Sequence, residues 1–226
     1  MHLDLVWVIY RNKSRIAKEK ASSVVKELKS ENIRVISSTS NFTEYPNLIN
    51  QIAKKDFPDL AIILGGDGTV LAATHYLAIH NIPILSFNVG GNLGFLTDIS
   101  PNELLELLSE VLLGKYKVDK RGFLEAEIST SSKRLIALNE FVVHTESTAK
   151  MIEFDVYVDE VFVYRLKADG IIISSTTGST AYSLSGGGPI IHPKVNAISL
   201  VPIFPHSLSS SPFVISGDSE IKLVLS

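Results

Sequence analysis

Hydrophobic residues in the first half of the chain fall into short unbroken runs that are separated by segments with helical spacing. The apolar runs at 3–9, 33–37, 60–64 and 83–87 predict buried strands. Between the first two runs, residues 14–30 place apolar side chains on one stripe, which predicts an amphipathic helix. Strands that are apolar on both faces and alternate with helices are typical of a parallel sheet covered on both sides.

Three more helices are predicted in this half, at 46–55, at 70–79, and from Ser100 to near Gly114. Ser100 and Glu103 have the spacing of a capping box, in which each side chain accepts a hydrogen bond from the other residue's backbone N–H. We therefore expect the last helix to begin directly after Ser100.

The pattern changes near residue 117, where apolar and polar residues begin to alternate. Alternation predicts strands, and Asp159-Glu160 predicts a hairpin turn between two of them. The predicted strands are 123–130, 135–144, 152–158, 161–166, 171–174, 198–204, 213–216 and 221–225, with one helical turn near 180–184. We therefore predict an α/β domain with a parallel sheet over residues 1–116 and an all-β, sandwich-like domain over residues 117–226.

Composition mainly excludes classes of function. The content of 45% hydrophobic and 20% charged residues is typical of a globular protein, and the net charge of −3 indicates no general affinity for nucleic acid or anionic lipid. The chain has no cysteine, which excludes disulfides, and its six histidines are scattered, which disfavours a zinc site. No signal peptide and no membrane-spanning segment is predicted. We expect a cytoplasmic protein that binds neither nucleic acid nor membrane.

The sharpest local feature is Gly65-Gly66-Asp67-Gly68-Thr69, between an apolar strand and a helix. Unpaired N–H groups at a helix N-terminus attract phosphate, and glycines let the backbone approach it. Asp67 would repel a phosphate that is only bound, so it indicates chemistry, as a metal contact or as a base facing a hydroxyl. The alternative, which the pattern alone does not separate, is a tight turn in which Asp67 caps the helix.

Other stretches also carry candidate binding groups. Residues 88–95 form a second glycine-rich loop after a buried strand, and residues 167–170 and 176–189 are rich in glycine and hydroxyl groups with one tyrosine. Asn139-Glu140 interrupts an apolar strand, where two polar side chains are costly unless they bind something or pair within the core. Loops that follow parallel strands gather at one edge of the sheet, which favours a shared ligand site.

These elements, in this order, resemble the ATP-dependent NAD kinase family, within the wider group that includes diacylglycerol kinases and phosphofructokinases. Gly65–Thr69 is similar to a signature of the wider group, whereas Asn139-Glu140 and the run from Asp169 through 177–189 are similar to NAD kinases in particular. Residues 205–208 also match. The resemblance covers about residues 60–225 closely and the first strand and helix loosely.

The resemblance implies transfer of the γ-phosphate of ATP to the 2′-hydroxyl of the adenosine ribose of NAD, giving NADP, with Mg²⁺ or another divalent cation. It implies Asp67 as the general base, Phe95 beside the adenine, and Asn139 and Glu140 at the ribose and nicotinamide portions. The ATP phosphate loop would be Gly65, Gly66, Gly68 and Thr69. The remaining NAD contacts would be Gly68, Lys150, Lys167, Asp169, Thr177, Thr180, Ala181, Tyr182, Ser183, Leu184 and Ser185. Because a neighbouring subunit completes the site in the family, a homodimer or homotetramer is expected.

Three departures from the family accompany the resemblance. Gly91-Asn92-Leu93 has Asn where many members have Arg or His, and Lys167 stands where Arg or Gly is common. Family members continue for several strands beyond residue 226, so we expect the second domain to be shortened. Two alternatives stay open: a lipid or sugar kinase with the same glycine loop, and a non-catalytic dinucleotide-binding module. Residues 177–188 with Asn139-Glu140 argue against the first, and Asp67 argues against the second.

Overall fold

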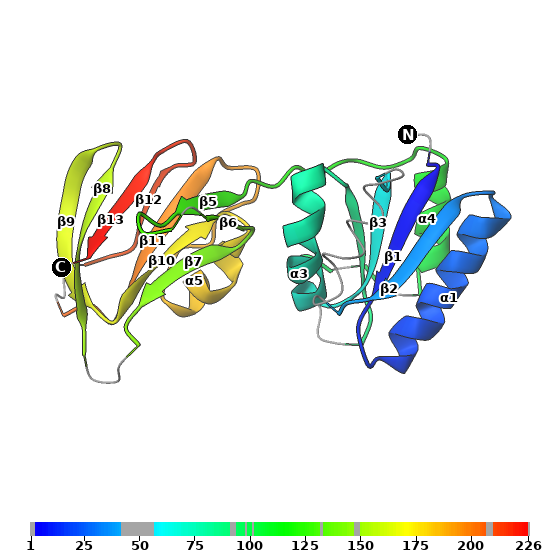
Figure 1. Ribbon diagram of the computed structural model, residues 1–226, viewed down its shortest axis with the longest axis horizontal. Helices are drawn as coiled ribbons and strands as arrows, with labels where there is room; N and C mark the ends of the chain where they lie inside the picture. Colours follow the sequence, from blue (N-terminus) through cyan, green and yellow to red (C-terminus); the bar gives the residue numbers. More distant parts are fainter. Residues whose placement is uncertain are drawn as a thin grey trace. The chain divides into compact units, whose positions relative to one another are not determined.

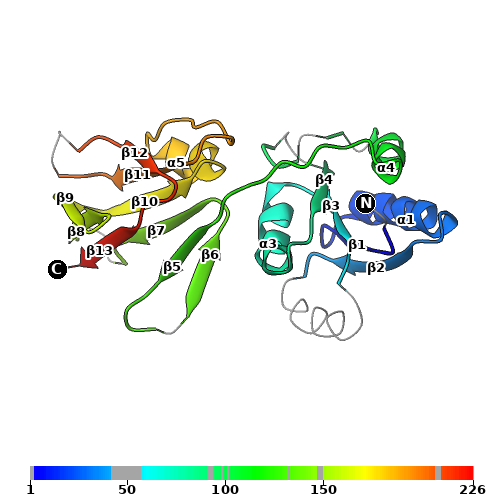
Figure 2. The same cartoon turned by 90° about the horizontal axis from the view of Figure 1, so that it is seen from above.

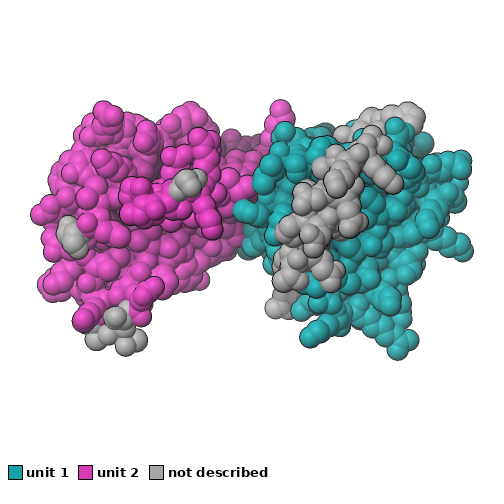
Figure 3. Space-filling view, in the orientation of Figure 1, with its two compact units in different colours: residues 1–118 teal, residues 119–226 magenta. Residues whose placement is uncertain are grey.

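The computed structural model describes residues 3–41, 57–90, 94–97, 99–100, 102–131, 133–146, 150–206 and 210–225. It divides into two compact units, Met1–Val118 and Asp119–Ser226, which are coloured separately in Figure 3. The helix predicted at 46–55 lies outside the described residues. Within the described part of the chain, no helix has the length and apolar character that a membrane span requires.

The first unit is built on a four-stranded parallel sheet in the order β2-β1-β3-β4 (Figure 1). The strands are β1 (Leu5–Tyr10), β2 (Arg34–Thr39), β3 (Leu60–Gly65) and β4 (Ile84–Asn88). This arrangement confirms the parallel sheet predicted from the apolar runs.

Helices cover both faces of this sheet. Helices α1 (Arg15–Ser30) and α4 (Leu104–Leu112) lie on one face and α3 (Asp67–Leu77) on the other, followed by a 3-10 turn at Ala78–His80 (Figures 1 and 2). In β1, Val6 and Val8 pack with α1 and α4, whereas Trp7 and Ile9 pack with α3. Because successive side chains point to opposite faces, a strand covered on both sides must be apolar throughout.

The helix starts show how local hydrogen bonds set the boundaries. Ser14 caps α1, accepting a hydrogen bond from the Ala17 N–H at 3.3 Å. The capping box predicted at Ser100 is wrong: α4 begins at Leu104, and the Ser100 hydroxyl accepts from the Asn102 N–H at 3.3 Å. A serine that bonds the N–H two residues ahead forms a local turn, which competes with its use as a helix cap.

The second unit is all-β, as predicted, except that it has two short helical turns where one was predicted. Its sheets have the orders β12-β11-β10-β7, β13-β8-β9 and β5-β6. The strands are β5 (Leu124–Glu127), β6 (Arg134–Ala137), β7 (Glu140–His144), β8 (Ile152–Val158), β9 (Val161–Ala168), β10 (Gly170–Ser175), β11 (Ala197–Ile203), β12 (Phe213–Ser216) and β13 (Ile221–Leu225). Buried side chains from the two larger sheets share one core, with Phe154 of β8 packed among residues that include Ile171 and Leu200.

The strand predicted at 135–144 is two strands, because β6 ends at Ala137 and β7 begins at Glu140. Between them the Leu138 carbonyl accepts from the Ser175 hydroxyl at 2.5 Å, and the Asn139 carbonyl accepts from the Ser175 N–H at 2.8 Å. The break therefore places Asn139 against the end of β10. This contact depends on a residue more than thirty positions away, which the local pattern does not reveal.

Candidate functional site

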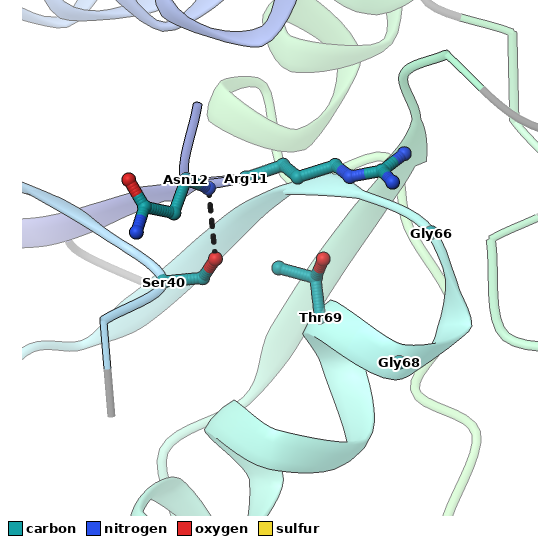
Figure 4. Close-up of a pocket in the computed structure, with 6 residues that line it drawn as sticks. All are labelled: Arg11, Asn12, Ser40, Gly66, Gly68 and Thr69. Carbon is teal, nitrogen blue, oxygen red and sulfur yellow. Dashed lines mark hydrogen bonds between the residues drawn. The ribbon is translucent and has the colours of Figure 1, made fainter. Parts of the chain in front are cut away.

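The strand order of the parallel sheet locates a ligand crevice. The chain runs outward from β1 to β2 and then crosses to β3 on the other side of β1, so the order reverses between β1 and β3. Ligands of open α/β sheets bind outside the carboxyl ends of the strands at such a reversal. A pocket of about 430 Å³ lies there (Figure 4), and its lining residues are Arg11, Asn12, Ser40, Gly66, Gly68 and Thr69.

The pocket offers a cation, hydroxyl groups and a helix N-terminus. The Arg11 guanidinium donates to the Gly90 carbonyl at 3.0 Å, and the Asn12 N–H donates to the Ser40 hydroxyl at 3.0 Å. The Thr69 side chain is only 9% exposed, and its hydroxyl has no hydrogen-bond partner among the described residues. With the first turn of α3 beside them, these groups suit an anion such as a phosphate chain.

Three of these lining residues were missed at the level of sequence. Arg11 and Asn12 follow β1 directly, and Ser40 follows β2 directly. Their position was the available signal, because the carboxyl ends of neighbouring parallel strands meet at one edge of the sheet. Only the glycine loop after β3 was singled out, since its composition is distinctive.

Gly65 allows β3 and α3 to approach closely. A Cβ on Gly65 would overlap the side chain of Thr69, which belongs to the first turn of α3. Gly66 and Gly68, by contrast, have open space where a Cβ would lie. The glycine at position 65 is therefore required by packing, whereas those at 66 and 68 leave the backbone open to the pocket.

Asp67 is the first residue of α3, and its carboxylate is held by a segment of the second glycine-rich loop. The Phe95 N–H donates to Oδ2 at 2.9 Å, the Leu96 N–H donates to Oδ1 at 3.2 Å, and the Thr97 hydroxyl donates to Oδ1 at 2.8 Å. A Cβ on Gly94 would overlap this carboxylate. Phe95 itself is 70% exposed, while the predicted phosphate contacts at Gly91-Asn92-Leu93 lie outside the described residues.

In the second unit, Asn139, Glu140 and Thr177 are brought together. Glu140 lies opposite Ser174 in the β7–β10 ladder, and Thr177 follows β10 by two residues. Asn139 Oδ1, Glu140 Oε2 and Thr177 Oγ1 are buried and have no hydrogen-bond partner within the described residues. Burial raises the pKa of Glu140 above its ordinary value. Buried polar atoms without partners are costly, which makes this cluster a candidate contact surface for a polar ligand.

The helical turns after β10 continue this cluster. They are a 3-10 turn at Gly178–Thr180 and the short helix α5 at Tyr182–Ser185. Thr180 and Ala181 are half-buried, and Tyr182, Leu184 and Ser185 are exposed. Ser183 is fully buried with its hydroxyl 3.5 Å from that of Ser199, a contact within the core.

Lys150, Lys167 and Asp169 lie at the other end of β10. The Asp169 carbonyl accepts from the Thr145 N–H at 2.9 Å, directly before β10 begins. Lys167 is exposed on β9, and Lys150 is exposed just ahead of β8 at the same end of that hairpin. The six residues of β10 separate the two groups by about 20 Å, at about 3.3 Å per residue.

The fold and these sites define a two-unit protein, with an α/β unit that carries a phosphate-type pocket and a β-sandwich unit that carries an unsatisfied polar cluster. Residues 6–116 match the family model of the ATP-NAD kinase N-terminal domain, and residues 138–226 match that of the ATP-NAD kinase C-terminal domain. The chain therefore belongs to the ATP-NAD kinase family.

Curated relatives and solved structures agree with this assignment. NAD kinases of Pseudomonas entomophila and Teredinibacter turnerae are 52% and 49% identical over 171 and 170 residues, which is 74% of this chain and 57% and 58% of theirs. The crystal structure of yeast NADH kinase complexed with NADH has a TM-score of 0.83 and 26% identity over 99% of this chain and 68% of its own. An NAD kinase from Archaeoglobus fulgidus in complex with ATP has a TM-score of 0.74 and 27% identity, over 98% and 80%. The alignments with these curated relatives span less than two thirds of the relatives' length.

Proposed function

We propose that the whole protein is an ATP-dependent NAD kinase that phosphorylates the 2′-hydroxyl of the adenosine ribose of NAD. The observation that carries this proposal is the position of Asp67. Asp67 is the first residue of α3 and stands between Gly66 and Gly68, which both line the pocket suited to a phosphate chain. Family membership and the ATP named in the A. fulgidus structure support the donor, and the named activity of the relatives supports the acceptor.

The pocket would hold the phosphates of ATP. Arg11 supplies a positive charge, Thr69 supplies an unpaired hydroxyl, and the first turn of α3 supplies N–H groups. The ribose 2′-oxygen forms a bond to the γ-phosphorus while the bond from that phosphorus to the β–γ bridging oxygen breaks, and ADP leaves. Asp67 takes the proton of the 2′-hydroxyl. Phosphoryl transfer depends mainly on such positioning and charge stabilisation.

NAD would be recognised by the groups of the second unit that lack partners. Asn139, Glu140 and Thr177 would bond the ribose and nicotinamide portions, with Thr180, Ala181 and Tyr182 beside them. Phe95, exposed on the first unit, would offer its ring to the adenine. Burial of unsatisfied oxygen atoms is tolerated where a ligand supplies the missing hydrogen bonds. Ser183 would support the NAD site from within the core, and Leu184 and Ser185 would line the edge of that site.

A divalent cation would bind this site together with the phosphates of ATP. Among the described residues, no group of three or more metal-ligating side chains is present. Mg²⁺ in kinases is held by one or two carboxylates together with substrate phosphates, and the carboxylate of Asp67 would be taken up by the ribose hydroxyl. Mg²⁺ would neutralise developing charge on the phosphates, so we propose that it arrives bound to ATP.

The separation along β10 supports an oligomeric site. Asp169, directly before β10, lies at the opposite end of that strand from Asn139 and Thr177 of the same subunit. Asp169, Lys167 and Lys150 would then contact the NAD of a neighbouring copy, which gives a homodimer or homotetramer.

The absence of cysteine agrees with a reducing compartment, and we propose that the protein is located in the cytoplasm.

The test is to incubate the full-length protein with ATP, Mg²⁺ and NAD and to measure NADP with an NADP-specific dehydrogenase. A parallel reaction with NADH tests the acceptor that the yeast structure names. NADP formation is expected. ATP consumption that depends on a lipid or sugar, with no NADP, would favour the other kinase class. An NAD-dependent rise in melting temperature without turnover would favour a binding module.

A further inference from the structure

We propose that Thr97 and Gly94 are positioning residues for Asp67, and that they leave Oδ2 as the oxygen that accepts the substrate proton. This inference rests on the proposed function and deepens it. According to this proposal, the glycine-rich loops after β3 and after β4 act together on one carboxylate. The first loop supplies the carboxylate, and the second fixes its orientation.

The hydrogen bonds divide unequally between the two oxygens of Asp67. Oδ1 accepts two, from the Thr97 hydroxyl at 2.8 Å and the Leu96 N–H at 3.2 Å, whereas Oδ2 accepts one, from the Phe95 N–H at 2.9 Å. An ionised carboxylate has about four acceptor positions, two on each oxygen. Oδ1 is therefore saturated, and Oδ2 keeps one position for an incoming hydroxyl.

Thr97 and Gly94 have different parts in this arrangement. Thr97 is fully buried, so its hydroxyl is held within the protein and its one described side-chain bond points at Asp67. Gly94 acts by its missing side chain, because a Cβ there would overlap the Asp67 carboxylate. Thr97 thus orients the carboxylate by a hydrogen bond, and Gly94 leaves the space that the carboxylate occupies.

The same segment ties the base to the residue that would meet the adenine. Phe95 donates its backbone N–H to Oδ2, while the residue is 70% exposed. A shift of the 94–97 segment would therefore move the Asp67 carboxylate and the ring together. Reaction rates are sensitive to misplacements on the order of 1 Å, so this connection matters to turnover.

The first test compares Thr97→Val, which keeps the shape but removes the donor, with Thr97→Ser, which keeps the donor. A hydrogen bond to a charged group is worth about 1.5 to 3 kcal/mol, so we expect Thr97→Val to lower kcat roughly 10- to 100-fold. KM for ATP and NAD should change less than about twofold, and Thr97→Ser should restore most of kcat. Thr74→Val is the matched control, because it also removes a buried hydroxyl, one that donates to the Val70 carbonyl within α3.

The second test is a double-mutant cycle with Asp67→Asn. If Thr97 acts through Asp67, the loss caused by Thr97→Val should largely vanish in the Asp67→Asn background. An equal loss in both backgrounds, or a loss matched by Thr74→Val, would overturn the proposal. Gly94→Ala should lower kcat as well, whereas Gly122→Ala, which has open space at its Cβ, should not.

The outcomes separate this inference from the proposed function. A wild-type protein that forms no NADP would refute the kinase, whereas an active wild type with an equally active Thr97→Val variant would refute only the positioning role. Melting temperatures recorded for every variant distinguish loss of turnover from loss of fold.

Discussion

Asp67 and Glu140 are two carboxylates that differ in the number of hydrogen bonds they accept. Asp67 accepts three hydrogen bonds, whereas the buried Oε2 of Glu140 accepts none within the described residues. The difference is physical evidence for different tasks. A satisfied carboxylate is held in one orientation, while an unsatisfied one has a place for a ligand donor.

Replacing Asp67 with Asn tests its role as the base. Asn is nearly isosteric but cannot accept the ribose proton, so we expect turnover to fall by about 10² to 10⁴. NAD binding should change little, whereas the melting temperature should fall, because the side chain of Asn has one acceptor oxygen for the donors of residues 95–97. The structure excludes a capping role, because Gly66 is the N-cap of α3 and no side chain caps this helix. A purely structural role for the bonds to residues 95–97 predicts near-normal turnover with a lower melting temperature. Kinetics and thermal melts on the same variant distinguish the two roles.

Replacing Glu140 with Gln should increase stability and weaken binding. Because burial raises the pKa of Glu140 in the folded state, the group favours folding when protonated, and this contribution is lost as the pH rises through the folded pKa. At pH 7 the carboxyl group of Glu140 therefore destabilises the fold relative to low pH, so Glu140→Gln should melt at a higher temperature and bind NAD more weakly. The gain in melting temperature should shrink as the pH falls towards 4.5. A lower melting temperature at pH 7 would show that Glu140 is stabilised by an interaction of its ionised form.

At the scale of elements, the junction of β3 and α3 depends on Gly65. A Cβ at this position would overlap Thr69, and overpacking of this kind costs about 1 to 3 kcal/mol. We expect Gly65→Ala to lower the free energy of unfolding by that amount in urea titrations. Gly66→Ala is the control, since its Cβ would meet open space and its φ of −102° suits any residue. Equal destabilisation by both would contradict a packing role for Gly65.

The sequence predicted most of the helices and strands, but it did not predict the contacts between distant segments. Apolar runs and alternation predicted the parallel sheet and the β-sandwich, because burial imposes those patterns directly on each strand. The break at Leu138-Asn139 was missed because the hydrogen bonds that cause it come from Ser175. Arg11 and Ser40 were missed for a similar reason, since only the sheet order brings them to the glycine loop.

At the scale of the whole molecule, the two groups of candidate residues at opposite ends of β10 predict complementation between subunits. Asp169→Ala and Glu140→Ala should each be nearly inactive alone. In a mixed dimer one site carries both changes and the other carries neither, so a 1:1 exchange should recover about a quarter of wild-type activity. Light scattering measures the oligomer in the same samples. Mixed oligomers that stay inactive would place all these residues in one subunit's site, whereas a single variant that keeps its activity would remove that residue from the site.

The position of β1 in the middle of the parallel sheet has a consequence for synthesis on the ribosome. Its six residues are buried or nearly so; Val6 pairs with Val35 on one side, and its partner on the other side is Leu60, which is made later. At about 5 to 20 residues per second, that partner emerges roughly 3 to 10 s later. During this interval one edge of the apolar strand has no partner in the nascent chain, and an unpaired edge is prone to join other chains. The segment Leu5–Tyr10 should therefore be where a chaperone first protects the growing polypeptide.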